Sequence, residues 1–358
     1  MSARPDLIVV GAGISALASA FWLAEAGLKP LVVASPDIPD LLPQLDLSLA
    51  LPWNRPRVLT QLEARGVTLM RELIIRLAQE TGVDLELGHR DLLMLGAAGE
   101  SSSSSCPLDS TDISEGPISS FEPQLVQGQE RARCLHRRAS VRSDRLIRAL
   151  ALALASRGVE ILTHQRVKRL EVTGNIVLGV ELNNHELLFA DATVLAADQA
   201  SAALLYDSGL EAIAGGSRLA PALQFVPSST ALGCAVIEPS ILLAPREEGC
   251  LVAMSNLDPS QRAPLRLNEL RLQVHRCLPG LGRHDLQRRG VMPVPGTVLK
   301  ASIGSYPGVR GLWINTGHDA LGPLIAPAAA EFLTEQLSGG PAVADLEPTF
   351  SRSMQPSC

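Results

Sequence analysis

Aromatic residues are scarce in this sequence. Phe, Trp and Tyr together make up 3% of its 358 residues, so unpaired bases would find few rings on which to stack. Basic residues are not in excess either, because 37 Asp and Glu outnumber 31 Lys and Arg and give a formal net charge of −6. A nucleic-acid-binding protein usually presents a basic face. We therefore expect no nucleic-acid partner, and a core built mainly from Ala, Leu and Val.

Closely spaced cysteines are also absent. The six cysteines are scattered without any C-x-x-C pair, at Cys106, Cys134, Cys234, Cys250, Cys277 and Cys358. This spacing predicts neither a zinc site nor a disulfide framework. We expect reduced thiols, no metal and a cytoplasmic protein.

One long stretch near the start of the sequence is free of charge, "LIVVGAGISALASAFWLA" at residues 7–24. It admits three interpretations: a membrane anchor, a secretion signal, or the start of a nucleotide-binding domain. Eighteen residues only reach the lower limit for crossing a bilayer. An Ala-Ser-Ala near its end resembles a signal-peptidase site, but the positive flank is Arg4 alone, followed by Asp6. We expect no membrane span.

The character of this stretch changes partway along. Leu7 to Val10 is a short β-branched run typical of a buried parallel strand. Glycines at 11 and 13 interrupt it, helical spacing resumes from Ile14 to Ala26, and residues 30–33 indicate a second strand. A strand, a glycine turn, a helix and a strand within about thirty residues form a βαβ unit.

The turn carries the spacing G-x-G-x-x-A, from Gly11, Gly13 and Ala16. The first glycine permits a tight turn, the second lets a pyrophosphate approach the backbone, and a small third residue lets the helix lie close to the sheet. The N–H groups of the first helical residues, Ile14 and Ser15, would face the phosphates. The turn therefore predicts dinucleotide binding.

One expected element is missing from this unit. An acidic residue usually ends the second strand and holds the ribose hydroxyls. Here that place falls at Ala34, with Ser35 next and Asp37 beyond. Ser35 offers one hydrogen bond in place of a bidentate acceptor.

Later segments continue the alternation of strands and helices. We predict a helix over 145–157, a strand over 159–162, a β-meander over 167–190 with turns at 173–175 and 183–184, and a buried strand over 192–197. A strand, a turn at Gly317 and a helix over 323–337 follow near the end. The run "SSSSSC" at 101–106 predicts a mobile surface loop.

In this order the segments resemble the glycine oxidase and D-amino-acid oxidase family of FAD-dependent oxidoreductases. The resemblance covers most of the chain, including Gly158-Val159, Ala190-Asp191 and "LLAPREEGCLVAMS" at 242–255. Its most specific part is Gly317-His318-x-x-x-Gly322-x-x-x-Ala326-Pro327.

This resemblance implies an α/β fold, with a Rossmann-like FAD-binding domain and a discontinuous β-rich substrate domain. The FAD-binding domain would comprise 1–85, 138–210 and 300–340, the substrate domain 86–137 and 211–299, and an irregular tail 341–358. FAD would be bound without a covalent link. The residues implied to contact it, besides those of the glycine turn, are Val167 at the adenine, Ala197, and the loop Gly317, His318, Asp319, Ala320, Leu321 and Gly322 at the flavin. His318 is either a catalytic residue or a loop histidine bonded to backbone.

Three departures from the family pattern bear on function. The alanine-glycine pair after the buried strand is Ala197-Asp198 here, which sets a carboxylate near the pyrophosphate. The arginine that clamps the substrate carboxylate is replaced by Met292, which cannot donate a hydrogen bond. The active-site tyrosine is replaced by Leu242. Arg246, Arg288 and Arg289 lie nearby in sequence.

Two classes of function remain open. In the first, the protein oxidises a C–N bond of an amine or amino-acid-like substrate by hydride transfer to flavin, with His318, Met292, Leu242 and Arg289 as candidate active-site residues. In the second, the fold persists without turnover in a binding or regulatory subunit. A protein partner or a homo-oligomer is compatible with both.

Overall fold

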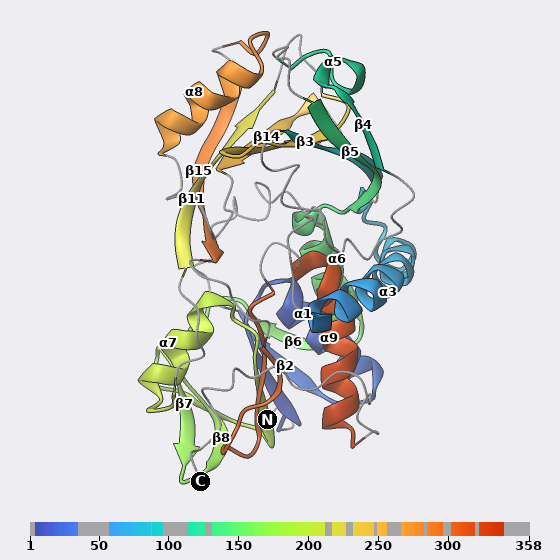
Figure 1. Cartoon of the computed structure of the whole chain (residues 1–358). Helices are drawn as coiled ribbons and strands as arrows, with labels where there is room; N and C mark the ends of the chain where they lie inside the picture. Colours follow the sequence, from blue (N-terminus) through green and yellow to red (C-terminus); the bar gives the residue numbers. More distant parts are fainter. Residues whose placement is uncertain are drawn as a thin grey trace.

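The computed structural model describes most of the chain as two large sheets, a small sheet and their covering helices (Figure 1). The described residues are 4–34, 57–86, 88–95, 113–125, 131–211, 217–226, 232–246, 249–255, 266–282, 285–295, 302–318 and 322–339. The sequence predictions for Ser35, Asp319, Ala320, Leu321, the serine run at 101–106 and the tail lie outside them.

A six-stranded sheet forms the centre of the Rossmann-like part, in the order β16-β17-β10-β1-β2-β6. Five of its strands run parallel, and β16 pairs antiparallel with β17 at one edge. The strands are β1 (Leu7–Val10), β2 (Pro30–Val33), β6 (Glu160–Leu162), β10 (Ala192–Leu195), β16 (Ser302–Ser305) and β17 (Leu312–Thr316).

Each face of this sheet is covered by different elements. Alternate strand residues such as Val9 and Val32 pack in one apolar cluster, together with four helices. These are α1 (Ile14–Glu25), α3 (Arg57–Thr81), α6 (Ser143–Ser156) and α9 (Gly322–Leu337). Ile8 and Val10 point to the opposite face, as the two-residue period of a strand requires. That face packs on a small sheet of β7 (Val167–Thr173), β8 (Ile176–Leu182) and β9 (Leu187–Phe189), and on α7 (Gln199–Asp207).

The second large sheet has eight strands, in the order β15-β11-β14-β13-β12-β3-β5-β4. They are β3 (Gly88–Leu95), β4 (Ile113–Pro117), β5 (Arg131–Ser140), β11 (Ser217–Phe225), β12 (Ala235–Ile237), β13 (Ile241–Pro245), β14 (Leu251–Ser255) and β15 (Leu286–Pro295). One face packs on α8 (Leu267–Cys277) and α5 (Ile118–Phe121) in an outer cluster, which includes Leu93, Leu223 and Leu270. The other face carries a separate, all-strand cluster that includes Ala220, Leu242 and Met254. Figure 1 shows α8 and α5 at the end of the molecule away from α1, α3 and α9.

The uncharged stretch at 7–24 is divided between two elements, because β1 ends at Val10 and α1 begins at Ile14. In the described part of the chain, no helix combines the length and the apolar character needed to cross a bilayer. The predicted βαβ unit is confirmed, as is the meander at β7 to β9. The predicted helix over 145–157 is α6, which begins two residues earlier, at Ser143.

The α/β fold class is confirmed, whereas the division into domains stays a prediction. Every strand of the six-stranded sheet comes from the segments assigned to FAD binding. The eight-stranded sheet comes from the other two segments, except that β5 continues past 137 to Ser140.

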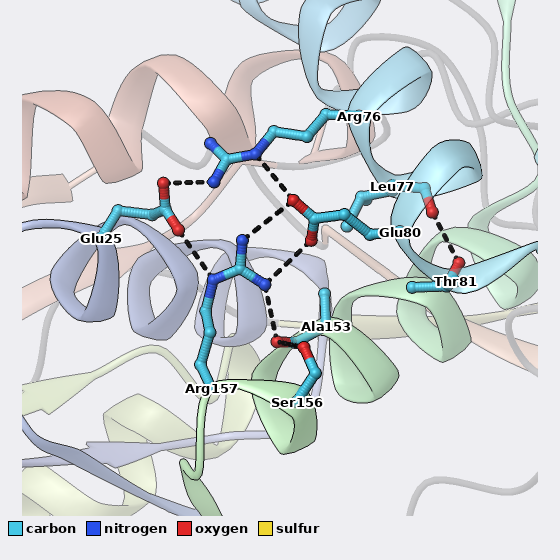
Figure 2. Close-up of polar contacts among 8 residues, drawn as sticks. All are labelled: Glu25, Arg76, Leu77, Glu80, Thr81, Ala153, Ser156 and Arg157. Carbon is cyan, nitrogen blue, oxygen red and sulfur yellow. Dashed lines mark hydrogen bonds and ion pairs between the residues drawn. The ribbon is translucent and has the colours of Figure 1, made fainter.

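A network of charged side chains joins three helices on the Rossmann-like part (Figure 2). Arg157, just after α6, binds Glu25 of α1 (2.7 Å) and Glu80 of α3 (2.9 Å). Arg76 of α3 binds the same two carboxylates. Both guanidinium groups also lie over the buried ring of Phe21, with Cζ 4.5 and 5.0 Å from its centroid. The network therefore fixes α1, α3 and α6 to one another around one aromatic ring.

Candidate active site

The candidate site lies at one edge of the six-stranded sheet. The carboxyl ends of β1, β2, β10 and β17 meet there because these strands are parallel. They lead into Gly11, Ala34, Ala196 and Gly317 respectively. In open α/β sheets, ligands bind beyond the carboxyl ends of the strands.

Gly11 is required by the packing of two strand ends. Its φ of +136° is a conformation that side chains rarely adopt, and a Cβ added there would lie 2.3 Å from the Ala196 carbonyl oxygen. Its N–H donates to the Val33 carbonyl at 3.0 Å. Ala16, fully buried, lies 3.0 Å from the same Cβ position. The first glycine and the small third residue therefore hold α1 close to the sheet, as the spacing predicts.

Gly13 has a different role, because its backbone is an ordinary extended one (φ −76°, ψ 176°). Among the described residues, a Cβ added at Gly13 would meet a single atom within 4 Å, the Asp198 Oδ2 at 3.7 Å. The adjoining N-terminus of α1 has no side-chain cap and no acidic residue in its first turn. Its first N–H groups therefore have no intrahelical acceptor, and the described residues leave room beside them for an approaching phosphate.

Asp198 stands at this same point and is the first anomaly of the site. Its backbone has φ 45° and ψ −115°, a region that favours glycine. Asp198 is exposed to solvent, yet many protein atoms crowd around its carboxyl, and their desolvating effect raises the pKa of that carboxyl to about 6. The residue thus adopts the conformation of the glycine that it replaces, and directs a carboxylate towards Gly13.

A buried chain of hydrogen bonds connects β17 with α1. His318 Nε2 donates to Asn315 Oδ1 (2.5 Å), and Asn315 Nδ2 donates to Ser19 Oγ (2.7 Å). Ser19 Oγ in turn donates to the Ser15 carbonyl (2.7 Å). Because the amide oxygen can only accept, His318 carries its proton on Nε2 and leaves Nδ1 as an acceptor.

His318 itself is 2% exposed, and burial lowers the pKa of its imidazole to about 4. The ring is therefore neutral at physiological pH. Within the described residues its Nδ1 is buried with no hydrogen-bond partner. The structure thus makes His318 a fixed, neutral acceptor at the start of the loop expected to contact the flavin. The hydrogen bond of His318 goes to the side chain of Asn315. The sequence alternative to a catalytic role was a loop histidine bonded to backbone, so its expected partner differs.

Ala197, Val167 and Ala34 lie close to this edge. Ala197 is half-buried, and its N–H donates to Ser201 Oγ at 3.2 Å. Val167 at the start of β7 packs in the same cluster as Val33 and Val10. Ala34 directly follows β2, and its N–H donates to the Leu162 carbonyl at 2.9 Å.

The residues proposed for the substrate side lie on the eight-stranded sheet. Leu242 is buried and pairs with Met254 in the all-strand cluster. Met292 pairs with Ala220, which belongs to the same cluster. Arg289 is exposed, and its cross-strand partner Leu223 packs in the outer cluster. Side chains directly opposite each other share a face, so this placement does not favour Arg289 as a substrate ligand.

Two residues of the buried chain were absent from the sequence prediction. Ser19 lies four residues after Ser15 in an otherwise apolar helix, and Asn315 interrupts the apolar strand "LWINT". A polar residue in a fully buried segment needs a hydrogen-bond partner. The sequence could therefore have indicated that Ser19 and Asn315 are hydrogen-bonded. Which partner each one takes depends on contacts 296 residues apart in the sequence.

Comparison with known proteins agrees with this geometry. A family model described as DAO, FAD dependent oxidoreductase, matches residues 6–336. A glycine oxidase from Pseudomonas aeruginosa is 28% identical over 96% of this chain and 97% of its own.

Solved structures share the fold. Glycine oxidase from Bacillus cereus superimposes with a TM-score of 0.80 at 17% identity, over 96% of this chain and all of that one. Iminodiacetate oxidase from Chelativorans sp. BNC1 gives 0.78 at 20% identity, over 95% and 97%. At these identities the structural likeness concerns the fold alone. Together with the family match over most of its length, the observed strand edge and glycine turn show that the chain belongs to the DAO family of FAD-dependent oxidoreductases.

Proposed function

We propose that this protein oxidises the C–N bond of an amine or amino-acid-like substrate. The observation that carries the proposal is the room that the described residues leave at Gly13, beside an uncapped helix N-terminus, in a chain of this family. When bound, FAD supplies the acceptor for a hydride from the carbon next to the nitrogen. The chain's own residues hold and orient the two molecules.

The cofactor would be held without a covalent link. Gly13 and the N–H groups of Ile14 and Ser15 would take the pyrophosphate, and Val167 would lie beside the adenine. The loop from Gly317 to Gly322 would contact the flavin, with Asp319, Ala320 and Leu321 at its centre. His318 Nδ1, a buried acceptor, would receive a hydrogen bond from a donor on this side of the site.

The substrate would meet an apolar surface. Leu242 and Met254 are buried side by side and carry no charge. Met292 stands where the family pattern has its carboxylate-binding arginine. An α-carboxylate left unpaired there would lose the strongest contact available to a small ligand. We infer that the substrate is a less polar amine, or one delivered by a partner protein, although the relatives include oxidases named for glycine and iminodiacetate.

The second candidate, a binding or regulatory subunit without turnover, is favoured by one observation. Asp198 Oδ2 lies 3.7 Å from the Cβ position of Gly13, where a phosphate is expected. A charge there opposes the binding of an anionic cofactor.

The deciding experiment begins with the absorption spectrum of purified protein before and after incubation with excess FAD. A flavin spectrum, with the flavin released by acid precipitation, supports a noncovalent flavoprotein. Gly13→Glu should abolish binding because it fills the open space and adds a second negative charge. Protein that stays colourless with excess FAD, or a Gly13→Glu variant that binds normally, would refute the cofactor assignment.

Turnover is then measured on a panel of amines and amino acids, as hydrogen peroxide formed or dye reduced. Reduction by an apolar amine, and not by glycine, sarcosine or simple D-amino acids at millimolar concentration, is the expected result. A protein that binds FAD and reduces it with no member of the panel supports the subunit candidate.

A further inference from the structure

Three side chains with metal-binding atoms converge on the eight-stranded sheet. They are Asp91 of β3 and Cys134 and His136 of β5, and their ligand atoms all lie within 4.8 Å of one another. His136 Nδ1 is 2.9 Å from Asp91 Oδ2 and 3.7 Å from Cys134 Sγ. None of these residues belongs to the candidate active site.

The backbone explains why the three meet. Cys134 and His136 are two residues apart on one strand and so point to the same face. Leu92 pairs with Leu135 and Leu93 with Cys134, which sets Asp91 opposite His136; the register shifts beyond this point, where Arg90 pairs with Arg138 and β5 carries the extra residue. Side chains opposite each other in an antiparallel pair are close neighbours, and this pairing brings the carboxylate to the imidazole. Cys134 packs in the outer cluster, on the face opposite Leu242.

The distances suit one small, borderline-soft cation. Zinc binds thiolate sulfur at about 2.3 Å, and imidazole nitrogen and carboxylate oxygen at about 2.0–2.2 Å, in tetrahedral geometry. Neighbouring ligand atoms of such a tetrahedron are therefore roughly 3.3–3.7 Å apart. The Cys134–His136 separation already matches, and the Asp91–His136 separation needs to open by a few tenths of an ångström.

A fourth residue orients the imidazole. Ser114 lies directly opposite Cys134 on the edge strand β4, and its Oγ is 2.6 Å from His136 Nε2. A histidine that binds metal through one nitrogen usually donates the other N–H to a nearby oxygen, which fixes its tautomer. Ser114 can accept that bond, leaving Nδ1 unprotonated towards Asp91 and Cys134.

The same contacts contain a Ser–His–Asp arrangement, which in some proteins activates a serine nucleophile. Two observations favour a metal instead. Cys134 approaches the very ring nitrogen that a triad reserves for its carboxylate. The Asp91 side chain is 43% exposed, whereas the orienting carboxylate of a triad is buried.

We propose that Asp91, Cys134 and His136 bind one zinc-class divalent cation, with Ser114 supporting the histidine. The side chains of His136 and Asp91 are 31% and 43% exposed, so the fourth ligand position is open to water or a small donor. The cation would link β3 to β5 near the end of the sheet. The site is independent of FAD.

The test uses full-length protein, with whatever FAD it carries, after removal of metals by a chelator. Cobalt(II) is added as a spectroscopic probe, and zinc is then added to displace it. We expect one cobalt per chain, with thiolate-to-cobalt absorption in the difference spectrum, and full displacement by zinc. Cys134→Ser should abolish that absorption, and Ser114→Ala should weaken binding about 10- to 100-fold.

Cys277→Ser is the matched control, because Cys277 is a half-buried thiol on α8, outside the cluster. It should behave as wild type. Asp91→Asn, at a partly exposed position, provides a second variant if Cys134→Ser does not fold. Wild-type protein that takes up no cobalt, or thiolate absorption that survives in Cys134→Ser, would overturn the proposal. Ester hydrolysis that Ser114→Ala abolishes in metal-free protein would overturn it in favour of a triad.

Discussion

At the scale of single residues, Asp198 separates two effects at the expected cofactor site. It combines a positive φ, a carboxylate near Gly13 and a raised pKa, and each of these has a separate consequence. The strained backbone costs roughly 1–3 kcal/mol, whereas the charge opposes an anionic ligand. Substitutions that change one property at a time can therefore separate the two effects.

Asp198→Asn and Asp198→Gly should both bind FAD at least about tenfold more tightly at neutral pH, a change of about 1.4 kcal/mol. Both remove the repulsion between the carboxylate and the pyrophosphate. Only the glycine variant also relieves the positive φ, so its Tm should exceed that of the asparagine variant. The measurements are quenching of FAD fluorescence by the apoprotein and thermal unfolding. Equal Kd values for wild type and both variants would show that the carboxylate does not reach the bound pyrophosphate.

The same residue predicts a pH dependence. Burial raises the pKa of Asp198 to about 6, so the carboxyl is neutral below that pH and charged above it. The Kd for FAD should therefore rise between about pH 5 and about pH 7. The stability that this group contributes to the apoprotein is fully present below about pH 4 and is lost as the pH rises through about 6. Asp198→Asn should remove both dependences, and a wild-type Kd that stays constant over this interval would contradict the assignment.

At the scale of elements, the charged network of α1, α3 and α6 carries a prediction. Arg157→Ala removes the bonds to Glu25 and Glu80 and one cation over Phe21. The free energy of unfolding should fall by about 1–2 kcal/mol, because a network joined to an aromatic ring exceeds an isolated surface pair. Arg148→Ala, at an exposed position on α6, is the control and should change the free energy of unfolding little.

The stability lost in Arg157→Ala should depend on pH. The hydrogen bond from Arg157 holds the pKa of Glu80 below its ordinary value. The network's contribution is therefore present at neutral pH and is lost as the pH falls below about 4. Wild type and Arg157→Ala should become equally stable in acid, as measured by urea unfolding.

A second prediction concerns the contact between α3 and α9. A Cβ added at Gly66 would lie 2.1 Å from the Leu324 carbonyl oxygen, in the first turn of α9. Gly66→Ala should therefore force α9 away and lower the free energy of unfolding by about 1–3 kcal/mol, despite the better helix propensity of alanine. FAD binding should weaken as well, because α9 follows the flavin loop. Thr68→Ala, exposed on the same helix, is the control, and a stabilised Gly66→Ala would contradict the close packing.

Elements built from local patterns were predictable from the sequence, and those built from distant pairing were not. The β1-α1-β2 unit is local, since strand, turn and helix signals follow one another from Leu7 to Val33. The order of the eight-stranded sheet is not local: β12 pairs with β3, for example, setting Val236 against Leu93. The zinc-class cluster also escaped prediction, because Asp91 meets Cys134 and His136 only through the pairing of β3 with β5, two strands far apart in the sequence.

At the scale of the whole molecule, family membership identifies the cofactor and the reaction class but not the substrate. The substrate would meet residues of two parts of the molecule. One is the loop after β17 in the Rossmann-like part, which is expected to contact the flavin, and the other is the all-strand face of the eight-stranded sheet. The Rossmann-like part has the glycine turn expected to bind a dinucleotide and departs from the family pattern at Ala34 and Asp198. On the eight-stranded sheet, Leu242 and Met292 stand where the family pattern has a tyrosine and an arginine, so we expect a different contact with the substrate.

That division predicts a gain of function. Met292→Arg should restore a bidentate partner for an α-carboxylate, the contact whose loss from a buried pair costs about 3–5 kcal/mol. Glycine or sarcosine should then bind at least about tenfold more tightly, since each 1.4 kcal/mol is a factor of ten. The readout is the KM for amino-acid-dependent flavin reduction. Arg289→Met is the matched control and should change nothing, because Arg289 is exposed and shares its face with the outer cluster. Robust oxidation of glycine by wild type that Arg289→Met abolishes would mean that Arg289 is the carboxylate ligand after all.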